Sequence, residues 1–100
     1  MGLDVVLLNK EGKEIHSLEL SYEFHEAMFK SNFPWRKTVL KKIRDYYMAD
    51  ADYVGDSLAL FIKELELMEN RILSKYQDEL RSIIMKVKDP EVSRVYVIGD

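Results

Sequence analysis

The first twenty residues combine two apolar segments with a polar turn between them. Residues 3–8 are almost continuously apolar and β-branched at the centre, which predicts a strand buried on both faces. Residues 9–13 are polar and include Gly12, which can adopt a positive φ in a turn. Residues 15–20 alternate between apolar and polar, as an antiparallel strand with one wetter face does. The pattern predicts a β-hairpin, and because a lone hairpin is marginally stable in water, we expect later elements to cover it.

Helical spacing replaces alternation after residue 20. Ser21 can cap a first helix whose apolar side includes Phe24 and Met28. An Asn-Phe-Pro sequence then ends that helix, and proline favours the first turn of the next one. We therefore expect a second helix over residues 35–48, with Trp35 in the core and the basic side chains mostly outside.

Apolar residues next recur at close to helical spacing from Leu58 to Val87, with no glycine or proline in the interval. The pattern predicts a long helix over residues 57–88. A continuous helix of this length would measure about 45 Å, whereas a compact domain of this size has a radius of gyration of about 13 Å. We therefore expect the helix to bend or break near residues 74–77, although the sequence leaves its continuity open.

A β-branched strand, residues 92–98, closes the chain. The sequence as a whole predicts an α+β fold and a single domain over residues 1–100. In this fold the N-terminal hairpin and the C-terminal strand form one small sheet. Three to four helices, including the long one, are expected to cover one face of that sheet.

Composition indicates a globular protein of the cytoplasm. Charged residues make up 33% of the chain and apolar residues 47%, and cysteine is absent. The longest uninterrupted apolar run, residues 58–62, is far shorter than a membrane span. A secretory leader has a basic segment followed by an apolar one, and the N-terminus shows no such pattern. We expect no membrane association and a cytoplasmic location.

Three features of the sequence bear on catalysis or metal binding. The HEAMF sequence at residues 25–29 lacks the second histidine of a zinc peptidase, because that position is Phe29. The DADYVGD sequence at residues 50–56 resembles a calcium loop but has Phe61 where a carboxylate is required. Serines lie in no nucleophile elbow, and no glycine-rich phosphate loop is present. We expect no enzyme activity, no catalytic residue, no metal and no cofactor.

Charge is distributed in blocks along the chain. Residues 30–48 carry six basic side chains and one acidic one, whereas residues 49–70 carry six acidic side chains and one basic one. The basic block could contact phosphates, but the sequence pI of about 5.4 argues against nucleic-acid binding. Its other interpretation is a helix that forms ion pairs with the acidic helix after it.

The acidic block is the candidate binding site. Acids and a tyrosine lie on a predicted connecting segment, where binding residues concentrate. Tyrosine is frequent in interface hot spots, and clustered acids accelerate encounter with a basic partner. The other interpretation is a solvated polar loop that caps the next helix. The candidate partner-binding residues are Asp50, Asp52, Tyr53, Asp56 and Glu64.

Two segments resemble a known family. The opening MGLDVVLLNKEGKEIHSLEL, followed by SYEFHEAMF, resembles the small immunity proteins encoded beside bacterial polymorphic toxins, as does YVGDSLALFIKELELME later in the chain. The resemblance covers residues 1–30 and 53–69. The spacing Tyr-x-Gly-acid-polar-Leu at residues 53–58 is also similar to the inhibitory segment of the ribonuclease inhibitor barstar, although Ala59 replaces an acid of that segment.

Both resemblances imply an acidic inhibitor that binds a cognate protein toxin of its own cell stoichiometrically and occludes it. The alternative is a self-associating structural or adaptor protein without catalytic activity. That alternative rests on apolar residues that lie off the main stripe of the long helix and could form a homodimer, because excess apolar surface on a helix marks a partner. These residues are Leu60, Ile62, Leu67 and Leu73.

Overall fold

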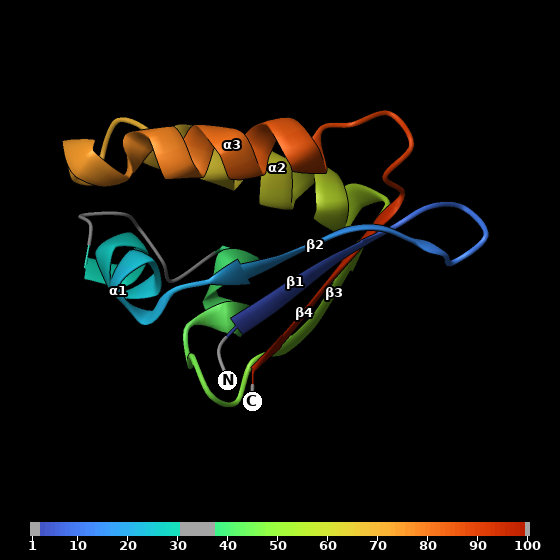
Figure 1. The fold of residues 1–100 in the computed structure, drawn as a ribbon, viewed down its shortest axis with the longest axis horizontal. Helices are drawn as coiled ribbons and strands as arrows, with labels where there is room; N and C mark the ends of the chain where they lie inside the picture. Colours follow the sequence, from blue (N-terminus) through green and yellow to red (C-terminus); the bar gives the residue numbers. More distant parts are fainter. Residues whose placement is uncertain (1–2, 31–37, 100) are drawn as a thin grey trace.

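The computed structural model describes residues 3–30 and 38–99 and confirms the α+β class. Over these ranges the strands are β1 (Leu3–Leu8), β2 (Glu14–Leu20), β3 (Asp50–Val54) and β4 (Arg94–Gly99). They form an antiparallel sheet in the order β2-β1-β4-β3. The helices are α1 (Tyr22–Lys30), α2 (Asp56–Met68) and α3 (Gln77–Val87). Figure 1 shows α2 and α3 stacked on one side of the sheet, with α1 beside its end.

The predicted N-terminal hairpin is confirmed. Gly12 has a φ of 80°, a conformation that glycine adopts without a steric penalty. The side-chain oxygen of Asn9 accepts hydrogen bonds from the backbone N–H groups of Glu11 (3.0 Å) and Lys13 (2.9 Å). Local polar chemistry therefore closes the turn and sets the β1–β2 register.

The sheet has one strand more than predicted. Residues 50–54, expected to be part of a connecting loop, form β3 and pair antiparallel with β4. Their side chains alternate between exposed and buried along the strand. Aspartate is depleted in strands, and the two aspartates here obscured an alternation that places Ala51 and Tyr53 in the core.

The N-terminus of α1 is capped as the sequence predicts. The Ser21 hydroxyl oxygen accepts a hydrogen bond from the backbone N–H of Phe24 at 3.1 Å. Phe24 and Met28 on this helix are fully buried, so the cap fixes the helix where its apolar side meets the core.

Replacing Ser21 with alanine is expected to lower the free energy of unfolding by about 1 kcal/mol, because one N–H of the first turn loses its acceptor. Urea denaturation followed by circular dichroism measures this. Ser93→Ala is the control, since the hydrogen bond that Ser93 donates to the Leu8 carbonyl oxygen comes from its backbone N–H, which the substitution leaves in place. Equal stability of the two variants would contradict the capping role.

The prediction of a second helix over residues 35–48 is wrong for residues 38–48, the part of it that the structure describes. Only Leu40–Ile43 are helical, as the short 3-10 helix η2, and a turn follows. Both Leu40 and Ile43 are buried, so a single turn already places the apolar side chains of this segment in the core. The predictions for Trp35 and for the helix start lie outside the described residues.

The predicted helix over 57–88 is broken, as its length required. α2 ends at Met68, a turn and the 3-10 helix η3 (Ser74–Tyr76) follow, and α3 runs back in the opposite direction (Figure 1). The side-chain amide of Gln77 donates a hydrogen bond to the carbonyl oxygen of Glu69 at 2.9 Å across this turn. Two antiparallel helices can both bury their apolar sides against the sheet, whereas one 45 Å helix would project beyond it.

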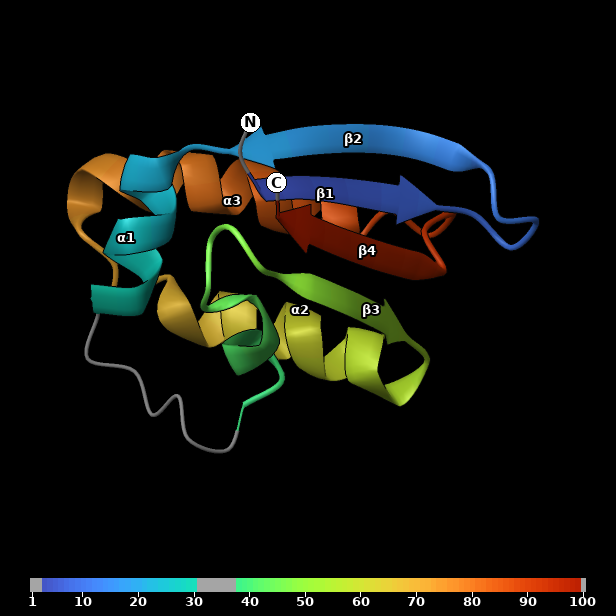
Figure 2. The same ribbon diagram turned by 90° about the horizontal axis from the view of Figure 1, so that it is seen from below.

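The core lies between the sheet and the helices. The strands contribute one alternating set of side chains, which includes Leu3, Val5 and Leu7 of β1 together with Val95 and Val97 of β4. The opposite set faces away from α2 and α3. Viewed from below, no described helix crosses in front of the strands (Figure 2). One sheet face is therefore left without a helical cover over the described part of the chain.

Candidate partner-binding surface

The uncovered sheet face, called here the open face, is a regular grid of side chains. Strand alternation and the register of the strand pairs determine which residues share this face. Val6, Tyr96 and Ile98 at its centre are half-buried, whereas most of the side chains from the two outer strands are polar and exposed. Strand by strand the open face comprises Glu14, Ser17 and Glu19 of β2; Asp4, Val6 and Leu8 of β1; Arg94, Tyr96 and Ile98 of β4; and Asp50, Asp52 and Val54 of β3.

One row of this grid concentrates negative charge. Glu19 pairs with Asp4, Asp4 pairs with Ile98, and Ile98 pairs with Asp50, so the four residues form a line across the sheet. We call this line the end row. With neighbouring strands about 4.8 Å apart, the end row spans about 14 Å. Like charges directly opposite on neighbouring strands repel each other, so the Asp4–Glu19 pair concentrates negative charge at this end of the sheet.

Two polar contacts order the β3 side of the open face. The Tyr96 hydroxyl donates a hydrogen bond to Asp50 Oδ1 at 2.9 Å. This hydrogen bond, together with the negative charge of the Asp50 carboxylate, raises the pKa of Tyr96 above its ordinary value, because both favour the protonated phenol. Arg94 Nε lies 3.1 Å from Asp52 Oδ1. Arg94 thus balances the charge of Asp52 on this side of the sheet.

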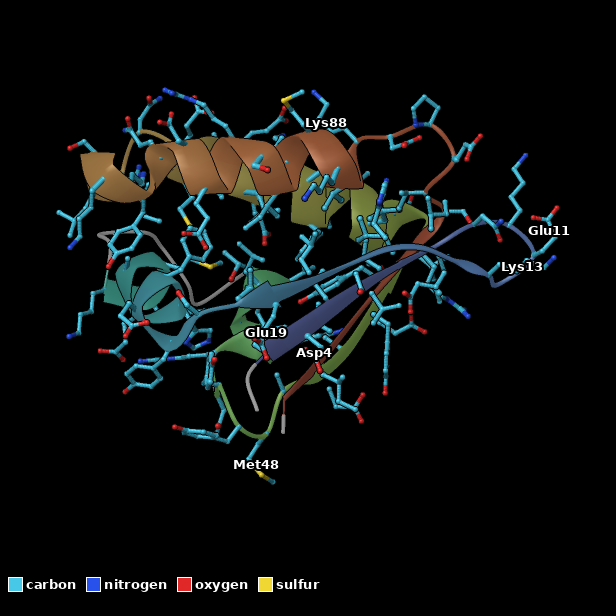
Figure 3. All side chains as sticks on the ribbon, viewed as in Figure 1. Asp4, Glu11, Lys13, Glu19, Met48 and Lys88 are labelled. Carbon is cyan, nitrogen blue, oxygen red and sulfur yellow. The ribbon has the colours of Figure 1, made fainter. Side chains whose placement is uncertain are left out.

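The open face also contains a shallow depression of about 490 Å³. Its lining includes Asp4 and Glu19 from the end row together with Val6 and Ile98. Figure 3 shows Asp4 and Glu19 on the side of the sheet opposite α3, whereas Lys88 lies on the helical side of the molecule. Contact area and negative charge therefore coincide on this face.

The structure separates the five predicted binding residues. Asp50 and Asp52 lie together on the open face, where the prediction that they bind a partner stays untested. Asp56 is exposed in the first turn of α2, beyond the end of β3. Tyr53 and Glu64, which were also predicted to contact a partner, both have buried side chains and do not lie on the open face; no observation tests whether they bind a partner.

Tyr53 is part of the core. Its ring stacks on Phe61 with the centroids 4.4 Å apart, and its hydroxyl donates a hydrogen bond to the Val39 carbonyl oxygen at 2.6 Å. Burial, with a smaller contribution from Glu64, raises the pKa of Tyr53 far above its ordinary value. Tyr53 is thus a neutral core residue that fixes the chain before η2.

Glu64 supports the same segment from α2. Its Oε2 accepts a hydrogen bond from the backbone N–H of Val39 at 3.1 Å, and its Oε1 accepts one from that of Leu40 at 3.0 Å. The carboxylate therefore satisfies N–H groups at the start of η2. This role is structural, and it uses both oxygens of the side chain.

Sequence reasoning missed the β1 and β2 members of the end row. The sequence predicts strands at Asp4 and Glu19, but it also predicts that residues 3–8 are buried on both faces, which leaves no surface for Asp4. In the structure β1 is buried on one face only. Asp4 within an apolar run was the available signal, because a charged residue there indicates a solvated face. The register that aligns Asp4 with Glu19 and Asp50 could not be known from the sequence.

The two histidines have different surroundings in the described part of the chain. His25 is buried, with its Nε2 2.7 Å from the Ile43 carbonyl oxygen and its ring against Phe29. His16 Nε2 lies 4.0 Å from an oxygen of Asp89 at the surface. No group of three or more potential metal ligands occurs among the residues described.

Comparisons with protein-family models, curated proteins and solved structures found no match. Among the helices that the structure describes, none has the length and apolar character needed to cross a membrane.

Proposed function

We propose that this chain is an immunity protein that binds a cognate protein toxin in the cytoplasm and neutralises it stoichiometrically by covering its working surface. The observation that carries the proposal is the end row, where three carboxylates cross a sheet face that no described helix covers. The resemblance of residues 1–30 and 53–69 to immunity proteins points to the same class.

Physical chemistry supports such a role for the open face. A cluster of one charge sign raises the local concentration of an oppositely charged partner and accelerates association. Apolar side chains at the centre of a surface with a polar margin are typical of protein interfaces. Val6, Tyr96 and Ile98 are half-buried at that centre. The partner favoured by this arrangement is a protein with a basic surface.

The test of function is co-expression with the toxin domain of the protein encoded beside this chain's gene. We expect that domain alone to arrest bacterial growth and the two proteins together to restore it. Purified together, they should form a one-to-one complex. Growth arrest that persists despite equal expression would contradict the proposed function.

Reversing two charges of the end row tests the surface. The double variant Asp4→Lys/Glu19→Lys is expected to slow association with the toxin domain about tenfold or more at low salt, because electrostatic steering is lost. The dependence of the association rate on salt should flatten as well. Stopped-flow kinetics between about 20 and about 500 mM salt, a range over which the Debye length falls from roughly 20 Å to roughly 4 Å, measures both quantities.

The matched control is Glu11→Lys/Asp78→Lys, which changes the net charge equally at exposed positions on the hairpin tip and on α3. This control is expected to keep most of the association rate. If the two double variants slowed association equally, total charge rather than the open face would govern the encounter, and the surface assignment would be wrong.

Self-association is the second candidate. It rests on Leu60, Leu67 and Leu73, which are large apolar side chains exposed on the helical side of the molecule. Leu60 and Leu67 are seven residues apart and thus lie on one side of α2. Sedimentation velocity across a hundredfold concentration range tests this candidate, and a monomer at every concentration would exclude a homodimer of useful affinity.

A further inference from the structure

A turn at the end of the sheet holds two exposed hydrophobic side chains. Tyr47 is 54% exposed and Met48 is 77% exposed, and both belong to the turn between η2 and β3. Figure 3 shows Met48 pointing away from the molecule, on the same side of the sheet as Asp4 and Glu19. Large exposed apolar side chains on a small protein require an explanation when they occur together.

Hydrogen bonds within the turn fix its backbone. One oxygen of the Asp45 side chain accepts from the backbone N–H groups of Tyr47 at 3.1 Å and Met48 at 3.2 Å. The hydroxyl of Tyr46 donates a hydrogen bond to the Leu20 carbonyl oxygen at 2.9 Å. The turn is therefore tied both to itself and to the end of β2.

The turn is also tied to β4. The backbone N–H of Gly99 donates a hydrogen bond to the Ala49 carbonyl oxygen at 2.8 Å. A side chain at residue 99 would collide with the Tyr46 carbonyl oxygen and lie 2.9 Å from the Tyr47 carbonyl carbon. This close backbone approach requires glycine. Gly99 pairs with Leu3, one residue from the end row, so the turn adjoins the acidic margin of the open face.

Aromatic contacts restrict the side chains as well. The ring of Tyr46 meets the rings of Tyr22 and Tyr47 edge to face, with centroid distances of 5.3 Å and 5.2 Å. Tyr47 thus has a supported orientation although half of it is exposed. A side chain that is ordered before binding loses little conformational entropy in a complex, which increases affinity.

We infer that Tyr47 and Met48 are the apolar anchor of the interface, inserted into the basic protein partner that covers the open face. This inference rests on the proposed function and adds the residues that determine how long the complex lasts. Tyrosine is enriched in hot spots, and methionine adapts to irregular apolar pockets. The adjoining end row supplies the charge that selects a basic partner, whereas the anchor supplies apolar contact.

The experiment compares Tyr47→Ala/Met48→Ala with wild type in binding to the purified toxin domain encoded beside this chain's gene. The anchor variant is expected to bind at least about 30-fold more weakly. Most of the loss should appear as faster dissociation, because affinity changes within one interface lie mainly in the dissociation rate. Both replaced side chains are exposed, and thermal unfolding verifies that the variant remains folded.

The matched control is Leu73→Ala/Met85→Ala, which removes two side chains that are 64% and 75% exposed on the helical side. Unchanged binding by this control together with loss by the anchor variant supports the inference. Wild-type affinity in the anchor variant overturns the inference and leaves the proposed function standing. Failure of the wild-type chain to bind the toxin domain overturns both.

Discussion

Replacing Tyr53 with alanine is expected to lower the free energy of unfolding by about 3–5 kcal/mol, the range for deletion of a large buried aromatic side chain. Tyr53 is fully buried, and its ring stacks on Phe61 where β3 meets α2. The deletion would leave a cavity between a strand and a helix, where packed elements on both sides limit collapse. Chemical denaturation of wild type and variant measures the loss.

Two further variants separate the causes. Tyr53→Phe keeps the ring but leaves the Val39 carbonyl oxygen without its donor, so a smaller loss of about 1–3 kcal/mol is expected. Tyr47→Ala removes the same side chain at an exposed position and should change stability by no more than about 0.5 kcal/mol. If Tyr53→Ala unfolded like wild type and instead weakened binding, the sequence-based assignment of Tyr53 to an interface would be correct after all.

The contrast between Tyr53 and its neighbours shows what the sequence could have predicted. In the segment Asp-Ala-Asp-Tyr-Val the two aspartates point to the open face, and Ala51 and Tyr53 point to the core. A period of two is the primary signal for a half-buried strand. The low strand propensity of the two aspartates and the nearby Gly55 indicated a loop instead, which masked the alternation of residues 50–54.

Elements that depend on local chemistry were predicted correctly. The hairpin turn follows from Asn9 and Gly12, and the start of α1 follows from Ser21, because each of these residues acts on backbone groups within four positions. The break of the long helix was expected from length alone. Its turn lies in residues 69–73, slightly before the predicted position, where neither glycine nor proline marks it.

Features that depend on distant residues could not be predicted in this way. The open face combines acids from β1, β2 and β3, and their alignment depends on a register that joins β1 and β3 to β4 near the other end of the chain. The sequence therefore identified Asp50 and Asp52 as candidates but not Asp4 and Glu19. Residues 45–48 were predicted to be helical but form a turn. The Asp45 side chain accepts hydrogen bonds from the backbone N–H groups of Tyr47 and Met48, a local pattern that is typical of turns.

Glu64 is the clearest case of a long-range effect, and its replacement gives the second large expected result. Glu64→Ala is expected to lower the free energy of unfolding by about 2–4 kcal/mol. The backbone N–H groups of Val39 and Leu40 would lose a charged acceptor that lies 25 and 24 residues away in the sequence, respectively. Hydrogen bonds to charged groups contribute more than neutral ones, and a buried donor without a partner retains its full desolvation cost. Urea denaturation with two spectroscopic probes measures the change.

Glu66 on the same helix provides the matched control. Its Oε2 lies 2.9 Å from Lys88 Nζ, but both side chains are about half exposed, at 45% and 53%. Exposed ion pairs contribute little, so Glu66→Ala should cost less than about 1 kcal/mol. Glu64→Gln offers a second comparison, because its amide has only one acceptor oxygen for two N–H groups. Its free energy of unfolding should lie between those of Glu64→Ala and wild type. If Glu64→Ala were as stable as Glu66→Ala, the carboxylate would not be what holds η2 against α2. The buried acid would then need another explanation.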